Sequence, residues 1–334
     1  MRKYISISML VLVLVCSALL ALTGYAAEKI ISYNFNVGHS YAASSVPNQI
    51  CVDFGKMLSE RTDGRLKLTI FTDAQMGSDS VMFEALQMKS MDILVGGMGI
   101  VSSVAPQYNI LGVPYVLRDW DHAVAVLEGE PGRIMAEAVE NNSNIKFIGF
   151  SKRGARQLTA NKEIRTPGDM AGFVLRVPAN PQYLIFWEKI CTASPLAWGE
   201  VYTALQQGLF DGQENPIDQI YDYNLNEVQK YLILTSHLDN PYYYWINKNS
   251  FYDLSQEDQA LFMNTLKEAI SKGNQEVDAV NEDKLEKLKK KGMIVIEPDV
   301  EAFIEVAKQA HQEEINKGTA DPDFYQLIMS VRSN

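Results

Sequence analysis

The chain has 334 residues, of which 47% are hydrophobic and 21% are charged, and its formal net charge is −11 at pH 7. This length allows two hydrophobic cores of ordinary size, because single cores stop growing near about 250 to 300 residues. The negative charge argues against a nucleic acid or an anionic membrane as a partner, whereas a small anion in a cleft would respond to the local field of a few cations.

Residues 1–27 have the pattern of a secretory signal. Arg2 and Lys3 precede the apolar run MLVLVLVCSALLAL, and small residues at Gly24 and Ala26 suit a signal peptidase. A membrane anchor is the alternative, but the run is shorter than the roughly 20 residues that a bilayer span needs. We therefore expect residues 1–27 to be removed and the mature protein to be exported to the periplasm.

From residue 30 the sequence alternates between β-rich runs and amphipathic helical runs. Strands are predicted at 30–37, 65–72 and 92–99, and the helices between them at about 44–64 and 79–91. Crossovers of this length join parallel strands, so a mainly parallel sheet covered by helices is expected.

A second unit is predicted to follow, with strands at KFIGF, ARQLTAN and FVLRVP and helices at about 181–192 and 199–209. The run YYYWIN, at 242–247, is predicted to return to the first unit, so that the chain crosses between two lobes more than once. The expected division is lobe I at 28–153 plus about 241–280, and lobe II at 154–240 plus about 281–334, with hinge crossings near residues 153 and 240.

The segment from Ser255 to Gly292 predicts one long helix, with Ser255 as its N-cap and a weak point at Gly273. A continuous helix of about 36 residues would be about 54 Å long, so it must lie across both lobes. A last strand at 292–299 and a last helix at 300–317 are predicted after it.

The stretch DGQENP, at 211–216, lies between two helical patterns. The first pattern predicts a helix at 200–210 whose Leu209 faces inward, and Asn215 is expected to begin the next helix. A helix N-terminus favours an anion, because it presents unpaired amide donors and the positive end of the helix dipole. A capped turn with no ligand is the alternative.

The sequence contains none of the common patterns of enzymes or metal sites. Its four histidines are widely separated, and HExxH, Walker and G-x-S-x-G patterns are absent. We therefore predict no catalytic residue, no metal and no cofactor.

Two arginines lie twenty residues apart in predicted strands, Arg156 in ARQLTAN and Arg176 in FVLRVP. If these strands are neighbours, both guanidinium groups would face one wall of a cleft, where arginine binds a carboxylate through two parallel hydrogen bonds. The alternative is that each arginine pairs with a local acid on the surface.

Three runs in this chain resemble the DctP-type solute receptors of tripartite ATP-independent periplasmic (TRAP) transporters: GARQLTANKEIRTPGDMAGFVLRVP, SPLAWGEVYTALQQGLFDGQENPIDQI and NEVQKYLILTSH. The resemblance covers essentially the whole mature chain. It implies an α/β, two-lobe periplasmic-binding-protein-like fold with a long helix spanning both lobes. It also implies a monomeric receptor that closes on a small organic acid anion and delivers it to the small and large membrane subunits for uptake driven by an ion gradient.

The resemblance also assigns a ligand site. It makes Arg176 the main carboxylate ligand, joined by Arg156 and Asn215, with Trp198 as a wall of the pocket. Further ligand-binding residues are expected at Asp79, at His39 and Ser40 in the first loop, and at Arg153.

Two features by which this chain departs from the pattern of the family bear on the identity of the solute. Gly97 stands where sialic-acid receptors carry a glutamate, which argues against sialic acid. Arg153 would admit a second carboxylate or a sulfonate if it points inward, and would be a solvated surface charge if it points outward. Sugar acids, hydroxy or keto acids, aromatic acids and C4-dicarboxylates all stay open.

Two other functions are compatible with an exported chain of this kind. An enzyme acting on organic acids would need an acid or base in the cleft, for which His39 and Asp79 are the candidates. A ligand-sensing receptor for a signalling partner would use the same cleft with a different docking surface.

Overall fold

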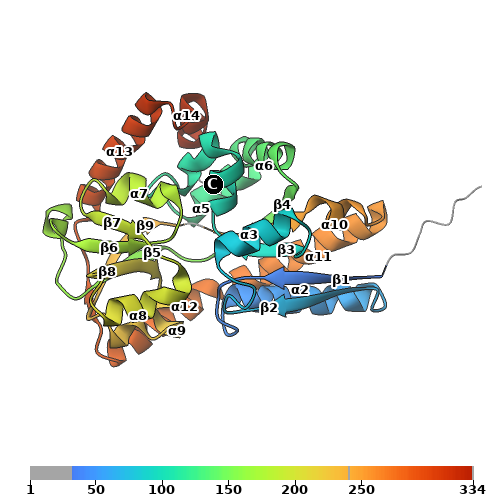
Figure 1. Ribbon diagram of the computed structural model, residues 1–334, viewed down its shortest axis with the longest axis horizontal. Helices are drawn as coiled ribbons and strands as arrows, with labels where there is room; N and C mark the ends of the chain where they lie inside the picture. The colour runs from blue at the N-terminus through green and yellow to red at the C-terminus, as the bar shows by residue number, and fades with distance from the viewer. Residues whose placement is uncertain (1–31, 240, 333–334) are drawn as a thin grey trace, which may run out of the picture. The chain divides into compact units, whose positions relative to one another are not determined.

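The computed structural model describes residues 32–239 and 241–332, and the residues from Tyr33 onward form one compact unit. The expected signal at 1–27 lies outside the described residues. Two β-sheets lie side by side in this unit, each with helices packed on it (Figure 1). We call the first sheet with the helices that pack on it the first-sheet side, and the second sheet with its helices the second-sheet side.

The first sheet has the strand order β2-β1-β3-β10-β4. β1 is parallel to β2 and to β3, whereas β10 is antiparallel to β3 and β4. The strand predicted at 242–247 is therefore in the first sheet. The strands are β1 (Tyr33–Gly38), β2 (Leu66–Phe71), β3 (Ile93–Gly96), β4 (Ile145–Ser151) and β10 (Tyr242–Asn247).

Helices cover both faces of the first sheet, because its strands alternate their buried side chains between two cores. Tyr243 and Trp245 of β10 pack into one core, while Tyr242 and Tyr244 pack into the other. The helices of this side are α2 (Val46–Arg61), α3 (Asp79–Gln87), α4 (Gly99–Val104), α5 (Trp120–Glu128), α6 (Glu130–Asn142) and α10 (Lys248–Tyr252), with the 3-10 helix η1 (Pro106–Gly112).

The second sheet has the order β11-β9-β5-β8-β6-β7, and β5 is antiparallel to both of its neighbours. Its strands are β5 (Arg156–Ala160), β6 (Val174–Val177), β7 (Thr192–Pro195), β8 (Gly212–Pro216), β9 (Tyr231–Leu238) and β11 (Ile294–Ile296). Its helices are α7 (Pro181–Trp187), α8 (Val201–Gln206), α9 (Ile217–Asp222) and α13 (Val300–Lys317), with the 3-10 helices η2 (Pro167–Met170), η3 (Trp198–Glu200) and η4 (Leu225–Glu227). The α/β class with two sheets is confirmed.

The stretch DGQENP is not the predicted junction between helices, because Gly212–Pro216 forms β8 in the middle of the second sheet. A Cβ on Gly212 would lie 2.1 Å from the carbonyl oxygen of Thr159, so the neighbouring strand requires glycine there. The preceding helix α8 ends at Gln206, and Leu209, which we expected to face inward, has 63% of its surface exposed.

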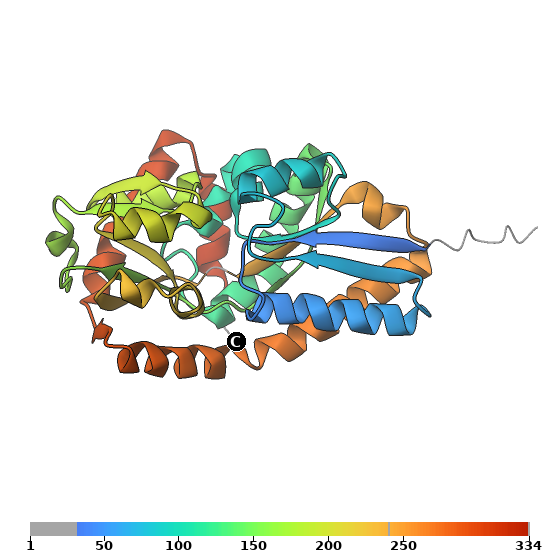
Figure 2. The ribbon, with the colours of Figure 1, turned by 60° about the horizontal axis from the view of Figure 1, so that its bottom comes forward.

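The predicted long helix is two helices, α11 (Gln256–Asn274) and α12 (Val277–Lys290). Between them the backbone N–H groups of Gln275 and Glu276 donate to the carbonyl oxygens three residues back. This tighter turn interrupts the series of α-helical hydrogen bonds. α11 packs on α2 and α12 packs on α9, so the pair still runs along both sides (Figure 2).

The C-terminal segment departs from the expected assignment of 281–334 to lobe II. α13 packs on α7 and β9 of the second-sheet side, but α14 (Pro322–Ser330) packs on α6. Phe324 and Ile328 are buried in the core of the first-sheet side, which explains why α14 lies there. The division into two moving lobes stays a prediction. Among the described residues, no helix is both long and apolar enough to cross a bilayer.

Candidate functional site

A cavity of about 640 Å³ opens between the two sides of the unit. The first-sheet side contributes the loop after β1, the start of α3, the end of β3 and the start of α4. The second-sheet side contributes the end of β6 and the segment before α8. Strand ends and helix starts therefore meet at this cavity, the usual place for a ligand in an α/β sheet.

Arg176 at the end of β6 lines the cavity and is only 2% exposed. Its Nε and Nη2 donate to the carbonyl oxygen of Leu196 at 2.9 and 2.5 Å, while Nη1 has no hydrogen-bond partner among the described residues. Burial lowers the pKa of Arg176 to about 10, which still leaves it cationic at neutral pH. The group therefore offers a charged, unused donor that suits an anionic oxygen.

Trp198 also lines the cavity, and its ring lies 5.7 Å from the guanidinium carbon of Arg176. This contact holds the guanidinium against an aromatic wall. The rings of Trp198 and Tyr223 pack edge to face, with their centroids 4.8 Å apart. The sequence offers no motif that would have singled out Tyr223.

Across the cavity, Asp79 in the first turn of α3 and Ser40 in the loop after β1 both line the wall, and the Ser40 hydroxyl donates to the carboxylate of Asp79. Glu84 and Glu200 line the cavity as well, and Arg176 is the one cation among its described lining residues. The cavity is thus positive at one place and otherwise neutral or negative.

Arg156 does not line this cavity, although it is as deeply buried as Arg176. β8 lies between β5 and β6, so the two arginines are not on neighbouring strands. Nη2 of Arg156 donates to Glu214 Oε1 at 2.8 Å, and its Nε pairs with Oε2 of the same carboxylate. Arg156 therefore has an acid partner, but in the interior of the sheet rather than on the surface.

Glu214 also accepts a hydrogen bond from Nε2 of His237 at 2.9 Å. Burial by itself would raise the pKa of Glu214, but the charge of Arg156 and the bond from His237 outweigh it and lower the pKa to about 2. Burial lowers the pKa of His237, so the imidazole is neutral and carries its proton on Nε2. This cluster is a satisfied ion pair in a buried strand.

Two other expected site residues lie away from the cavity lining. Asn215 is buried in β8, and its amide donates to Gln213 Oε1 at 2.6 Å. His39 is fully buried, and its Nε2 lies 3.3 Å from Asn48 Oδ1. In this structure the two side chains contact neighbours within the protein.

Arg153 is neither the inward ligand of the cavity nor the solvated surface charge that we considered. Only 6% of its surface is exposed, and it does not line the cavity. Its guanidinium carbon lies 5.2 Å from the ring centre of Tyr41 and 4.7 Å from that of Tyr242. The two aromatic rings therefore hold this cation where the chain passes from β4 to β5.

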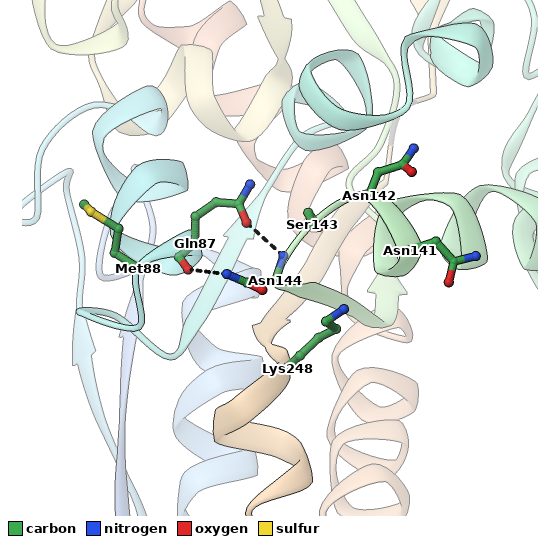
Figure 3. A pocket seen from close by; sticks show the side chains of 7 residues that line it. All are labelled: Gln87, Met88, Asn141, Asn142, Ser143, Asn144 and Lys248. Carbon is green, nitrogen blue, oxygen red and sulfur yellow. Dashed lines mark hydrogen bonds between the residues drawn. The ribbon is translucent and has the colours of Figure 1, made fainter.

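A second hollow of about 580 Å³ lies near the ends of α3 and α6 (Figure 3). Gln87 and Asn144 are hydrogen-bonded there, since Gln87 Oε1 accepts from the backbone N–H of Asn144 at 3.0 Å. The Lys248 ammonium donates to the carbonyl oxygen of Glu140 at 2.7 Å. The one cation among its described lining residues, Lys248, thus has a partner, unlike Nη1 of Arg176 in the first cavity. Among the described residues, no group of three His, Cys, Asp or Glu could hold a metal.

Comparisons with known proteins identify the family and the fold of this chain. The model of the DctP family, described as bacterial extracellular solute-binding protein family 7, matches residues 37–317. A solute-binding protein of Roseobacter denitrificans is 31% identical over 312 residues, which cover 93% of this chain and 94% of that protein. The 2,3-diketo-L-gulonate-binding periplasmic protein of Escherichia coli is 29% identical over 281 residues, covering 82% of this chain and 84% of that protein.

Two solved structures share the fold at a TM-score of 0.84. One is a TRAP periplasmic solute binding protein of Roseobacter denitrificans with bound L-galactonate, 28% identical, covering 91% of this chain and 99% of that one. The other is a TRAP periplasmic solute binding protein of Bordetella bronchispeptica with density assigned to pantoate. It is 30% identical, and the match covers 90% of this chain and 99% of that one.

Proposed function

The chain belongs to family 7 of the bacterial extracellular solute-binding proteins, the DctP family, and from this premise we propose that it is the periplasmic receptor of a TRAP transporter. It captures a small organic acid between its two sides and delivers it to the small and large membrane subunits for uptake driven by an ion gradient. It acts as a monomer and leaves the solute chemically unchanged.

The observation that carries this proposal is the buried guanidinium of Arg176 with an unused donor in a cavity of about 640 Å³. A carboxylate placed there would gain a charge-assisted hydrogen bond in surroundings that exclude most water. Of the two acid–base candidates for an exported enzyme, His39 does not line the cavity, and the carboxylate of Asp79 accepts a hydrogen bond from Ser40, which supports a receptor.

The charges of the lining narrow the solute to acids with a single carboxylate. A second carboxylate would meet Asp79, Glu84 or Glu200 without a second cation. Hydroxyl groups, in contrast, can donate to Asp79, and the ring of Trp198 can pack on a carbon skeleton. L-galactonate, which the Roseobacter protein binds, and pantoate, to which density in the Bordetella protein is assigned, are hydroxylated acids with one carboxylate.

The test begins with the solute that co-purifies with the protein, released by denaturation and identified by mass spectrometry. Calorimetric titration then compares L-galactonate and pantoate with succinate, a small dicarboxylate. We expect saturable one-to-one binding of a hydroxylated monocarboxylate, its recovery unchanged after incubation, and no binding of succinate. A preparation that carries no acid and binds none would refute the proposal.

A further inference from the structure

Tyr223 makes a hydrogen bond between the two sides of the unit at the edge of the cavity. It is the C-cap residue of α9 on the second-sheet side, and its hydroxyl donates to the carbonyl oxygen of Ser40 at 3.0 Å. Asp73 Oδ1, also on the first-sheet side, lies 3.3 Å from the same hydroxyl. One hydroxyl proton serves one acceptor at a time, and the carbonyl of Ser40 is the nearer.

The partners of Tyr223 are residues of the ligand site on both sides. On the second-sheet side its ring packs against Trp198, which stands over Arg176. On the first-sheet side Ser40 holds the carboxylate of Asp79 through its own hydroxyl. Tyr223 itself does not line the cavity. It therefore links the anion-binding wall to the wall that carries Asp79.

We propose that Tyr223 is a positioning residue that stabilises the closed, ligand-holding form through its hydrogen bond to the carbonyl oxygen of Ser40 at the edge of the cavity; we call this bond the latch. The inference rests on the proposed function and deepens it, because it assigns the closing contact to a residue that does not touch the solute. A bond made only in the closed form favours that form, and the solute is released only after the bond breaks.

The hydroxyl of Tyr223 is a dependable donor. Burial raises the pKa of Tyr223 to about 12, so the group stays protonated at any physiological pH. Its acceptor is a backbone carbonyl oxygen, which does not titrate, so its ability to accept the hydrogen bond does not depend on pH. The latch should therefore act equally across the neutral range.

The test replaces Tyr223 by Phe, which keeps the ring against Trp198 and removes only the hydroxyl. A matched control replaces Tyr202 by Phe, because its hydroxyl donates to Glu227 Oε2 at 2.7 Å within the second-sheet side. Stopped-flow mixing with L-galactonate and with pantoate gives the association and dissociation rates. Thermal unfolding of the ligand-free proteins is measured in parallel.

We expect Tyr223→Phe to release the acid about three- to tenfold faster, the effect of one ordinary hydrogen bond, with an association rate close to that of the wild type. Tyr202→Phe should release it at the wild-type rate. The latch is refuted if Tyr223→Phe dissociates from the acid at the wild-type rate. It is also refuted if only the association rate and the unfolding temperature decrease. Failure of the wild type to bind either acid would count against the proposed function instead.

Discussion

Arg156 and Arg176 are both buried guanidinium groups of the second sheet, yet only Arg156 has an acid in contact. Glu214 neutralises Arg156 inside the sheet, so that pair has little left to offer a ligand. Arg176 has only a carbonyl oxygen and an aromatic ring beside it. A buried cation without a counter-charge is costly, and a bound carboxylate would remove that cost.

Replacement of Arg176 by Ala should lower the affinity for the bound acid at least tenfold, about 1.4 kcal/mol, because the charge-assisted hydrogen bond is lost. Titration calorimetry with the acid that co-purifies measures the change. Arg165→Ala is the matched control, since Arg165 is exposed and pairs with Glu163. Undiminished affinity in Arg176→Ala would show that the carboxylate binds elsewhere.

At the scale of elements, β8 and the α11–α12 pair show how close packing decides local structure. β8 carries three consecutive polar residues, Gln213, Glu214 and Asn215, and it is a strand because side chains of the same sheet satisfy their polar groups. α11 passes so close to α2 that a Cβ on Gly273 would lie 2.3 Å from Cγ1 of Ile50.

Gly273→Ala should therefore destabilise the protein by about 1 to 3 kcal/mol, even though alanine favours helix more than glycine does. Urea unfolding followed by circular dichroism gives the free energy. Gly168→Ala serves as control, because the nearest atom to its Cβ would be Thr166 Oγ1 at 3.6 Å, an ordinary contact. Equal stability of the two variants would mean that α2 and α11 separate easily.

At the scale of the whole molecule, all four histidines are buried, on both sheet sides. Burial lowers the pKa of each of them: His39, His122, His237 and His311. Unfolding exposes the imidazoles and returns each pKa to about 6.5, so the unfolded chain binds more protons than the native protein below that pH.

The free energy of unfolding should consequently fall as the pH drops below about 6.5. Asp218 and Asp239, whose pKa values burial raises, act in the opposite direction, but they are two groups against four histidines. Each histidine lowers the free energy of unfolding by up to about 1.4 kcal/mol for each pH unit by which the pH falls from its unfolded to its folded pKa. Glu214, with its pKa lowered to about 2, adds a further loss below about pH 4.5. Urea midpoints from pH 7.5 to 4.5 at constant ionic strength measure the trend, and stability that rises as the pH falls from 6.5 would contradict it.

The sequence by itself determined the alternation of strands and helices in the first sheet from β1 to β3, the α/β class and the place of Arg176 in a strand. Hydrophobic periodicity and strand ends are local properties, and the runs that resemble a known family fixed how the elements combine. Only the tertiary structure decided that β8 is a strand, that Arg156 pairs with Glu214 and that Tyr223 reaches Ser40. Each of those outcomes depends on a partner far along the chain. Whether a polar side chain has a structural or a functional role depends on which group from a distant part of the chain packs against it. The periodicity of the sequence carries no information about that group.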